Sequence, residues 1–161
     1  MQNKENEIAV ILHDIRSVEN VGSIFRTADA AGVSKIYLSG ITPTPLDRFG
    51  RKRRDIAKVS LGAEEIVSWE QIADILSLIQ NLKKEKYVIV AIEQDANSIP
   101  YTDIPKEGKI AFVFGNEVEG IPRAILDACD VIAEIPMAGK KESLNVAVSV
   151  GIALFRYKEN T

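Results

Sequence analysis

Short, continuous apolar runs recur along the chain and predict buried β-strands. They cover residues 8–12, 35–38, 87–92, 110–114 and 131–135 and are rich in β-branched side chains. A strand with one solvated face alternates between apolar and polar residues, whereas these runs do not alternate. Strands covered on both faces of a parallel sheet have this composition. The pattern therefore predicts a parallel sheet with protein packed on both sides.

Between these runs, apolar residues recur at helical spacing. The first such stripe consists of Val21, Ile24, Phe25, Ala28 and Ala31. It predicts a helix with Asn20 as its N-cap and Gly32 at its end. Further helices are predicted over residues 69–84, directly after Pro122, and over 143–158. Alternating strands and helices indicate one α/β domain over residues 1–161, with helices on both faces of the sheet.

The longest irregular stretch, residues 40–57, is predicted to be extended and exposed because it contains Thr42-Pro43-Thr44-Pro45. A cluster of cations follows this tetrapeptide: Arg48, Arg51, Lys52, Arg53, Arg54 and Lys58, against the anions Asp47 and Asp55. The whole chain has a net charge of -3, so this basic segment is a local feature. It is a candidate phosphate-binding surface, and a merely solvated loop is the alternative.

Composition excludes several classes of protein. A chain of 161 residues that is 46% hydrophobic and 27% charged is typical of one globular domain. It contains no apolar stretch long enough for a membrane helix and no apolar secretory segment near Met1, so we expect a cytoplasmic protein without membrane contact. Its single Cys129 and single His13 leave little for an internal disulfide or a metal site.

Ligands of parallel α/β proteins bind beyond the carboxyl ends of the strands, so three segments are candidates for chemistry. These are residues 13–26, 114–120 and 135–146. The last is a Pro/Gly loop before a helix start, with Ser143 as a candidate cap. Each segment also has a purely structural interpretation, as a turn or a capped helix.

Familiar nucleotide and hydrolase motifs are missing. The sequence has no Gly-x-Gly-x-x-Gly loop after the first strand, no Walker-type loop and no Gly-x-Ser-x-Gly elbow. A serine hydrolase and a flavodoxin-like nucleotide-binding domain are therefore disfavoured.

Three motifs occur in order: Asn20-x-Gly22-x-x-x-Arg26-x-Ala28, Phe114-Gly115-Asn116-Glu117-x-x-Gly120, and Ile135-Pro136-Met137-x-Gly139-x-x-x-Ser143-Leu144-Asn145-Val146. Together they closely resemble the motifs of the SpoU (TrmH-like) RNA ribose 2'-O-methyltransferases of the SPOUT superfamily, over residues 8–156. The resemblance implies an α/β fold with a C-terminal trefoil knot, a homodimer, S-adenosylmethionine as methyl donor, and tRNA or rRNA as acceptor.

The resemblance also implies roles for individual residues. The cofactor would be held by Gly115, Ile135, Met137, Ser143 and Leu144. Arg26 would have the central catalytic role, with Asn20, Glu117, Ser143 and Asn145 around it. We expect Arg26 to clamp a phosphate and stabilise the developing alkoxide, because a guanidinium rarely gives up its proton. Whether it also acts as a base stays open.

No appended RNA-binding domain is expected within residues 1–161, so the basic segment becomes the predicted RNA-binding surface. The predicted last helix is apolar on two faces, which favours contact either with a second subunit or with its own domain. A catalytically inactive RNA-binding paralogue or partner subunit of the same fold is the alternative function.

Overall fold

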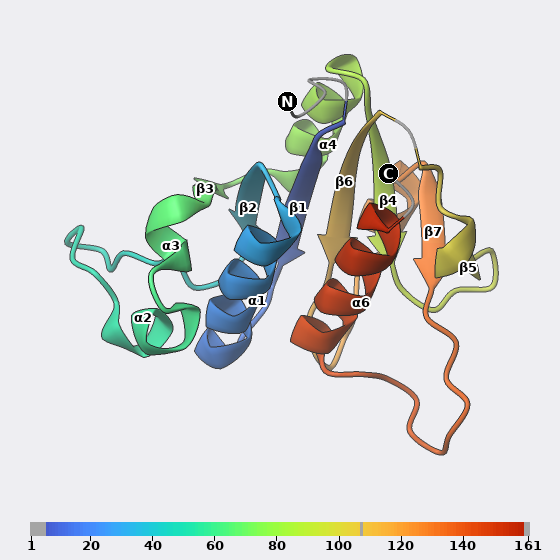
Figure 1. Ribbon diagram of the computed structural model, residues 1–161. Helices are drawn as coiled ribbons and strands as arrows, with labels where there is room; N and C mark the ends of the chain where they lie inside the picture. Colours follow the sequence, from blue (N-terminus) through green and yellow to red (C-terminus); the bar gives the residue numbers. More distant parts are fainter. Residues whose placement is uncertain (1–5, 107, 160–161) are drawn as a thin grey trace.

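Within residues 6–106 and 108–159, the computed structural model has one seven-stranded sheet in which every ladder is parallel (Figure 1). The strands are β1 (Ile8–His13), β2 (Lys35–Ser39), β3 (Ser68–Ile72), β4 (Tyr87–Ile92), β5 (Ile99–Pro100), β6 (Lys109–Phe114) and β7 (Val131–Glu134). Their spatial order is β3-β2-β1-β6-β4-β7-β5. All carboxyl ends therefore meet at one edge of the sheet.

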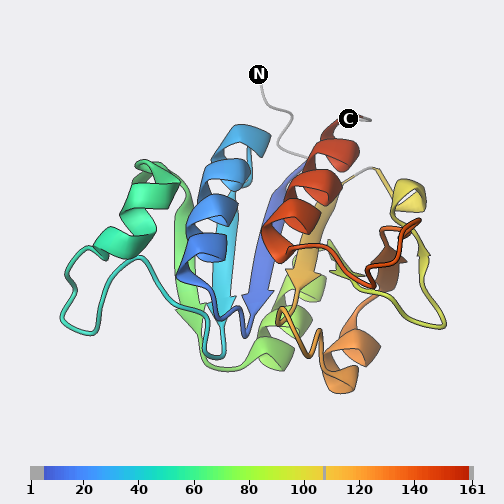
Figure 2. The ribbon, with the colours of Figure 1, turned by 90° about the horizontal axis from the view of Figure 1, so that it is seen from below.

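Helices cover both faces of this sheet, as predicted (Figure 2). One face carries α1 (Val18–Ala31), α2 (Arg54–Ser60), α3 (Ala63–Ile66) and α6 (Val146–Lys158). The other carries α4 (Ile75–Lys84) and α5 (Arg123–Ala128), and a short 3₁₀ helix, η1, spans Tyr101–Asp103. Each layer buries its own apolar cluster against the sheet. No helix in the described part of the chain is long and apolar enough to cross a membrane.

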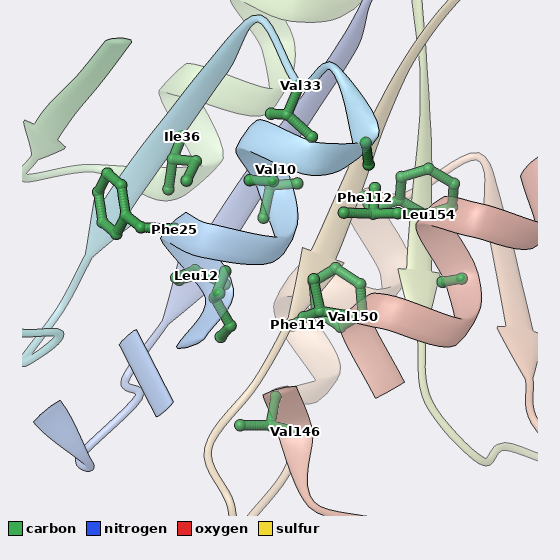
Figure 3. Close-up of a cluster of buried hydrophobic side chains, with 14 of the residues drawn as sticks. Val10, Leu12, Phe25, Val33, Ile36, Phe112, Phe114, Val146, Val150 and Leu154 are labelled. Carbon is green, nitrogen blue, oxygen red and sulfur yellow. The ribbon is translucent and has the colours of Figure 1, made fainter. Parts of the chain in front are cut away.

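The larger cluster lies between the sheet and the pair α1 and α6. Figure 3 shows the aromatic rings of Phe112 and Phe114 on β6 beside Leu154 and Val150 of α6, with the ring of Phe25 on α1 at the other end of the cluster. All five side chains are almost completely buried. The last helix is thus packed against its own domain on one side, and Val148 and Phe155 stay half exposed on the other.

Gly22 allows α1 and α2 to approach closely. A Cβ atom at this position would lie 2.8 Å from Val59 Cβ, closer than real Cβ atoms approach, and 3.0 Å from the Ile56 carbonyl oxygen, which is also a tight contact. The glycine of the first motif is therefore required by packing.

The five strands predicted from apolar runs are confirmed, to within one residue at either end. The helix predicted over residues 69–84 is wrong in its first part, because Ser68–Ile72 form the edge strand β3 and α4 begins only after Asp74. The Asp74 side chain accepts a hydrogen bond from the Ser77 amide at 3.2 Å and caps α4. Trp69 and Ile72 are three positions apart, which imitates a helical stripe.

Three predicted boundaries are also wrong. The N-cap of α1 is Ser17 rather than Asn20, and that of α6 is Asn145 rather than Ser143. The stretch 40–57 is not extended throughout, because α2 begins at Arg54. Nor is it fully exposed: Thr42 is buried, and its hydroxyl accepts from the Ile15 amide at 3.1 Å and donates to the Ser39 carbonyl at 2.8 Å.

Candidate functional site

A pocket lies at the carboxyl edge of the sheet, beside the ends of β4, β6 and β7. All five predicted cofactor-binding residues line it: Gly115, Ile135, Met137, Ser143 and Leu144. The rest of the lining is Ile92, Glu93, Gln94, Phe114, Asn116, Glu117, Val118, Gly120, Val146 and Ser149. Apolar side chains therefore face acidic and amide groups across one hollow.

The turn after β6 forms one wall of the pocket. The Asn116 side chain holds it: Nδ2 donates to the Asp14 carbonyl at 2.8 Å, and Oδ1 accepts from the Val118 and Glu119 amides at 2.9 Å. Gly115 lets the turn close, since a Cβ atom there would lie 2.7 Å from the carbonyl carbon of Gly120. This packing gives Gly115 a structural role in addition to any ligand contact.

Glu117 joins this turn to the start of α1. Its carboxylate accepts hydrogen bonds from the amides of Arg16 and Ser17 at 3.1 and 3.2 Å, and from Asn20 Nδ2 at 3.3 Å. Partial burial raises the pKa of Glu117, but these donors outweigh it and hold the pKa below its ordinary value. The carboxylate is thus ionised at neutral pH and lies where the dipole of α1 favours a negative charge.

A chain of amides continues from Glu117 to α6. Asn20 Oδ1 accepts from Asn145 Nδ2 at 3.1 Å, and Asn145 Oδ1 accepts from the Ala147 and Val148 amides at 2.9 and 3.4 Å. The orientation of each amide group follows from its partners, because an ionised carboxylate only accepts and a helix N-terminus only donates. We call Glu117, Asn20 and Asn145 the amide chain; it connects the three motif segments.

The structure does not bring every predicted catalytic residue to the amide chain. Ser143 lines the pocket with an exposed side chain. Arg26 is exposed on α1, outside the pocket lining, and makes no hydrogen bond or ion pair with the residues that the structure describes. Within one chain, no hydrogen bond therefore links Arg26 to Asn20, Glu117, Ser143 or Asn145, and its catalytic role stays a prediction.

Glu93 and Gln94 line the pocket and were not predicted. The Glu93 carboxylate accepts from the amides of Ile121 and Gln94, both at 3.0 Å, and the Gln94 side chain donates to the Glu142 carbonyl at 2.7 Å. These contacts tie the end of β4 to both loops that wall the pocket. Their position directly after an apolar strand was the signal that could have found them.

The predicted RNA-binding cations fall into two groups. Three form ion pairs nearby: Arg51 with Asp47 at 2.9 Å, Lys52 with Glu65 at 3.0 Å, and Arg53 with Asp55 at 2.7 Å. The other three, Arg48, Arg54 and Lys58, are exposed and have no ion pair with any described residue. The pairing lowers the uncompensated charge of the basic segment without removing it.

The pocket suits a ligand with an apolar ring and a positive charge. Ile135, Met137 and Leu144 offer apolar contact, and the carboxylates of Glu93 and Glu117 supply negative charge. In the part of the chain that the structure describes, no three His, Cys, Asp or Glu side chains are grouped so as to hold a metal ion.

Comparison with known proteins gives a consistent result. The sequence model of the SpoU rRNA Methylase family matches residues 7–155. The chain is 31% identical, over 96% of its length and 61% of the relative, to the 23S rRNA (guanosine-2'-O-)-methyltransferase RlmB of Pasteurella multocida (strain Pm70). It is 33% identical, over 91% of its length and 56% of the relative, to a putative TrmH family tRNA/rRNA methyltransferase of Staphylococcus haemolyticus (strain JCSC1435).

Among solved structures, an AdoMet-bound rRNA methyltransferase from Sinorhizobium meliloti superposes with a TM-score of 0.87 at 30% identity, over 99% of this chain and 58% of that one. The chain spans about three-fifths of the length of these relatives, 56–61% in the three comparisons.

Proposed function

The chain belongs to the SpoU rRNA Methylase family, and from this premise we propose that it transfers a methyl group from S-adenosylmethionine to a ribose 2'-hydroxyl of RNA. One observation carries the proposal: two of the three motif segments line a single pocket, and the amide chain ties the third, through Asn20, to both of them. The relatives named for 2'-O-methylation of rRNA support the reaction type.

The residues of the pocket fit S-adenosylmethionine. Leu144 is 37% exposed although it is apolar, so it offers free surface for an adenine ring together with Ile135 and Met137. Glu93 and Glu117 complement a sulfonium and an ammonium group. The bound cofactor supplies an electrophilic methyl group at a positive sulfur atom.

The remaining task of the protein is to align the ribose hydroxyl and to manage its proton. We assign the alignment to Arg26. Its planar guanidinium binds a phosphate through bidentate hydrogen bonds and stabilises the alkoxide that forms. Asn20, Glu117, Ser143 and Asn145 shape the wall on which the acceptor rests. The amide chain makes that wall rigid, because each of its groups has only one favourable orientation.

Arg26 lies outside the pocket of its own chain, and we therefore propose that it acts at the pocket of a second copy in a homodimer. The half-exposed apolar residues Val148 and Phe155 on the neighbouring α6 supply contact area for such an interface. The C-terminal trefoil knot stays a prediction of the family resemblance. We further propose that the acceptor is tRNA or rRNA and that the protein acts in the cytoplasm, where both occur.

Methyl transfer is the direct test of this function. The purified protein is incubated with labelled S-adenosylmethionine and total RNA from cells that lack it, and the labelled nucleotide is mapped. We expect label on a ribose 2'-oxygen. Tight RNA binding without cofactor binding or label would instead support the inactive paralogue, which is the alternative function.

The role of Arg26 has a sharper test. We expect Arg26→Lys to keep cofactor affinity but to lower turnover by about a hundredfold. Lysine keeps the positive charge but cannot make the paired hydrogen bonds of a planar guanidinium. Mixing Arg26→Lys with Glu117→Ala should then restore up to about a quarter of wild-type activity, since one site of each mixed dimer is intact. Absence of any restoration would show that Arg26 does not act across an interface.

A further inference from the structure

Residues 46–52 form a built hairpin within the basic segment, and we call it the 46–52 hairpin. Leu46 and Lys52 form an antiparallel bridge, and the Asp47 amide donates to the Arg51 carbonyl at 2.8 Å. Asp47 Oδ1 accepts from the amides of Phe49 and Arg51 at 2.8 and 2.9 Å, and its Oδ2 accepts from Arg51 Nε at 2.9 Å. A single carboxylate thus fixes the conformation of the tip.

The tip presents an aromatic ring among cations. Phe49 is 64% exposed, and the guanidinium carbons of Arg48 and Arg51 lie 4.8 and 4.9 Å from the centroid of its ring. The exposed face of this ring is apolar surface that a ligand can cover. Aromatic rings and guanidinium planes are both surfaces on which unpaired bases stack, and the cations attract phosphate.

We propose that the 46–52 hairpin binds an unpaired nucleotide of the RNA, with its base against Phe49 and its flanking phosphates on Arg48 and Arg51. The bases of a continuous duplex stack on one another and do not reach such a ring. This inference rests on the proposed function and names a feature of its substrate: an unpaired stretch of RNA.

The position of the hairpin determines which nucleotide it holds. Figures 1 and 2 both place residues 46–52 beyond α2, at the opposite end of the sheet from the 135–145 loop that walls the pocket. Within one chain, the stacked nucleotide is therefore a different one from the nucleotide at the pocket. An RNA bound by both must extend along the carboxyl edge of the sheet.

The first experiment measures RNA affinity by fluorescence anisotropy, with a labelled single-stranded oligonucleotide and with a blunt duplex of the same sequence. We expect Phe49→Ala to weaken single-strand binding about tenfold and to leave duplex binding unchanged. Phe49→Tyr should bind like wild type, whereas Phe49→Leu should bind like Phe49→Ala because it keeps apolar area without a π face. Ile66→Ala is the matched control, since Ile66 is 69% exposed and lies on α3, outside the 46–52 hairpin.

The second experiment separates a built hairpin from simple charge. Asp47→Ala removes an anion from a basic surface, so charge alone predicts tighter RNA binding. The hairpin predicts the opposite, a several-fold loss on the single strand, because the tip is no longer held. Asp47→Asn also removes the charge but keeps Oδ1 as an acceptor, and we expect it to bind at least as tightly as wild type. Tighter binding by Asp47→Ala would overturn the proposal.

The outcomes distinguish this inference from the proposed function. Calorimetry with S-adenosylmethionine and methyl transfer are measured on the same wild-type protein. If the wild-type protein transfers methyl groups and Phe49→Ala binds the single strand with the same affinity as wild type, only the inference is overturned. Phe49 would then be a contact for a protein partner rather than for RNA. If the wild-type protein does not bind the cofactor and does not transfer label, the proposed function is overturned, even if the Phe49 variants behave as expected.

Discussion

The two ends of the sheet are built in different ways. At the pocket, the hydrogen bonds that matter join residues far apart in sequence: 97 positions between Asn20 and Glu117, and 125 between Asn20 and Asn145. At the 46–52 hairpin, the bonds of Asp47 reach only two and four residues ahead. The hairpin is therefore encoded locally, whereas the pocket exists only once the whole sheet has assembled.

The same two ends differ in charge. The pocket holds the carboxylates of Glu93 and Glu117, and the hairpin carries Arg48 and Arg51. A chain with a net charge of -3 thus has a basic end at the hairpin and an acidic end at the pocket, as the proposed binding of RNA phosphates and of a cationic methyl donor requires. Substitutions in the two regions should have different consequences: loss of global stability and cofactor binding at the pocket, and loss of RNA binding alone at the hairpin.

Two glycine substitutions should show the largest contrast. Gly115→Ala places a Cβ atom against the backbone of Gly120, and we expect it to cost about 1–3 kcal/mol of unfolding free energy and most of the cofactor affinity. Gly50→Ala meets no atom within 4 Å, and its φ of +76° confines the strain to the hairpin. Thermal unfolding and calorimetry with S-adenosylmethionine measure both effects. Equal losses of melting temperature in the two variants would contradict the contrast.

Substitutions of Asn145 should have an intermediate effect. Asn145→Ala removes both the cap of α6 and the link to Asn20, and we expect a loss of about 1–2 kcal/mol by chemical denaturation. Asn145→Asp keeps an oxygen that caps the helix but cannot donate to Asn20 Oδ1. It should retain most of the stability and still bind cofactor less tightly. If Asn145→Asp binds cofactor like wild type, the amide chain does not organise the pocket.

The smallest effect is a dependence on pH. The lowered pKa of Glu117 means that its ionised form stabilises the fold above the ordinary pKa of a glutamate, and that this contribution is lost as the pH falls through the folded value. Glu117→Gln should therefore be less stable than wild type near pH 7, with the difference narrowing as the pH falls below the ordinary pKa of a glutamate.

Asp47→Asn provides the comparison for this titration. Hydrogen bonds from backbone amides, chiefly that of Arg51, also lower the pKa of Asp47. These bonds stabilise only an exposed turn. We expect no change in global stability from this variant across the same range of pH, as measured by melting temperature. A constant difference between Glu117→Gln and wild type at every pH would show that the carboxylate charge does not stabilise the pocket.

Five strands were predictable because each is a short apolar run whose neighbours in sequence are polar. Two strands were not: β3, whose residues Ser68–Ile72 are exposed or half exposed and follow the spacing of a helix, and β5, whose two residues Ile99–Pro100 are too few to form an apolar run. The caps of α1 and α6 were also missed. Asn20 and Asn145 are good capping residues by type, but only the fold decides that Asn20 bonds Glu117 while Asn145 caps its own helix.

Much of the pocket was predictable from the motifs, since Gly115, Ile135, Met137, Ser143 and Leu144 all line it. Glu93 and Gln94 belong to no motif and were found only in three dimensions. Arg26 shows the opposite case: a motif residue that one chain leaves at its surface.

The sequence by itself determined the parallel α/β fold and the family, because these depend on hydrophobic periodicity and on motif spacing. The turn of the 46–52 hairpin was not predicted from the sequence, although its hydrogen bonds join near neighbours. The tertiary structure decided how the pocket closes. Glu117, Asn20 and Asn145 lie on separate segments, and their hydrogen bonds form only after the parallel sheet brings the carboxyl ends of its strands to one edge.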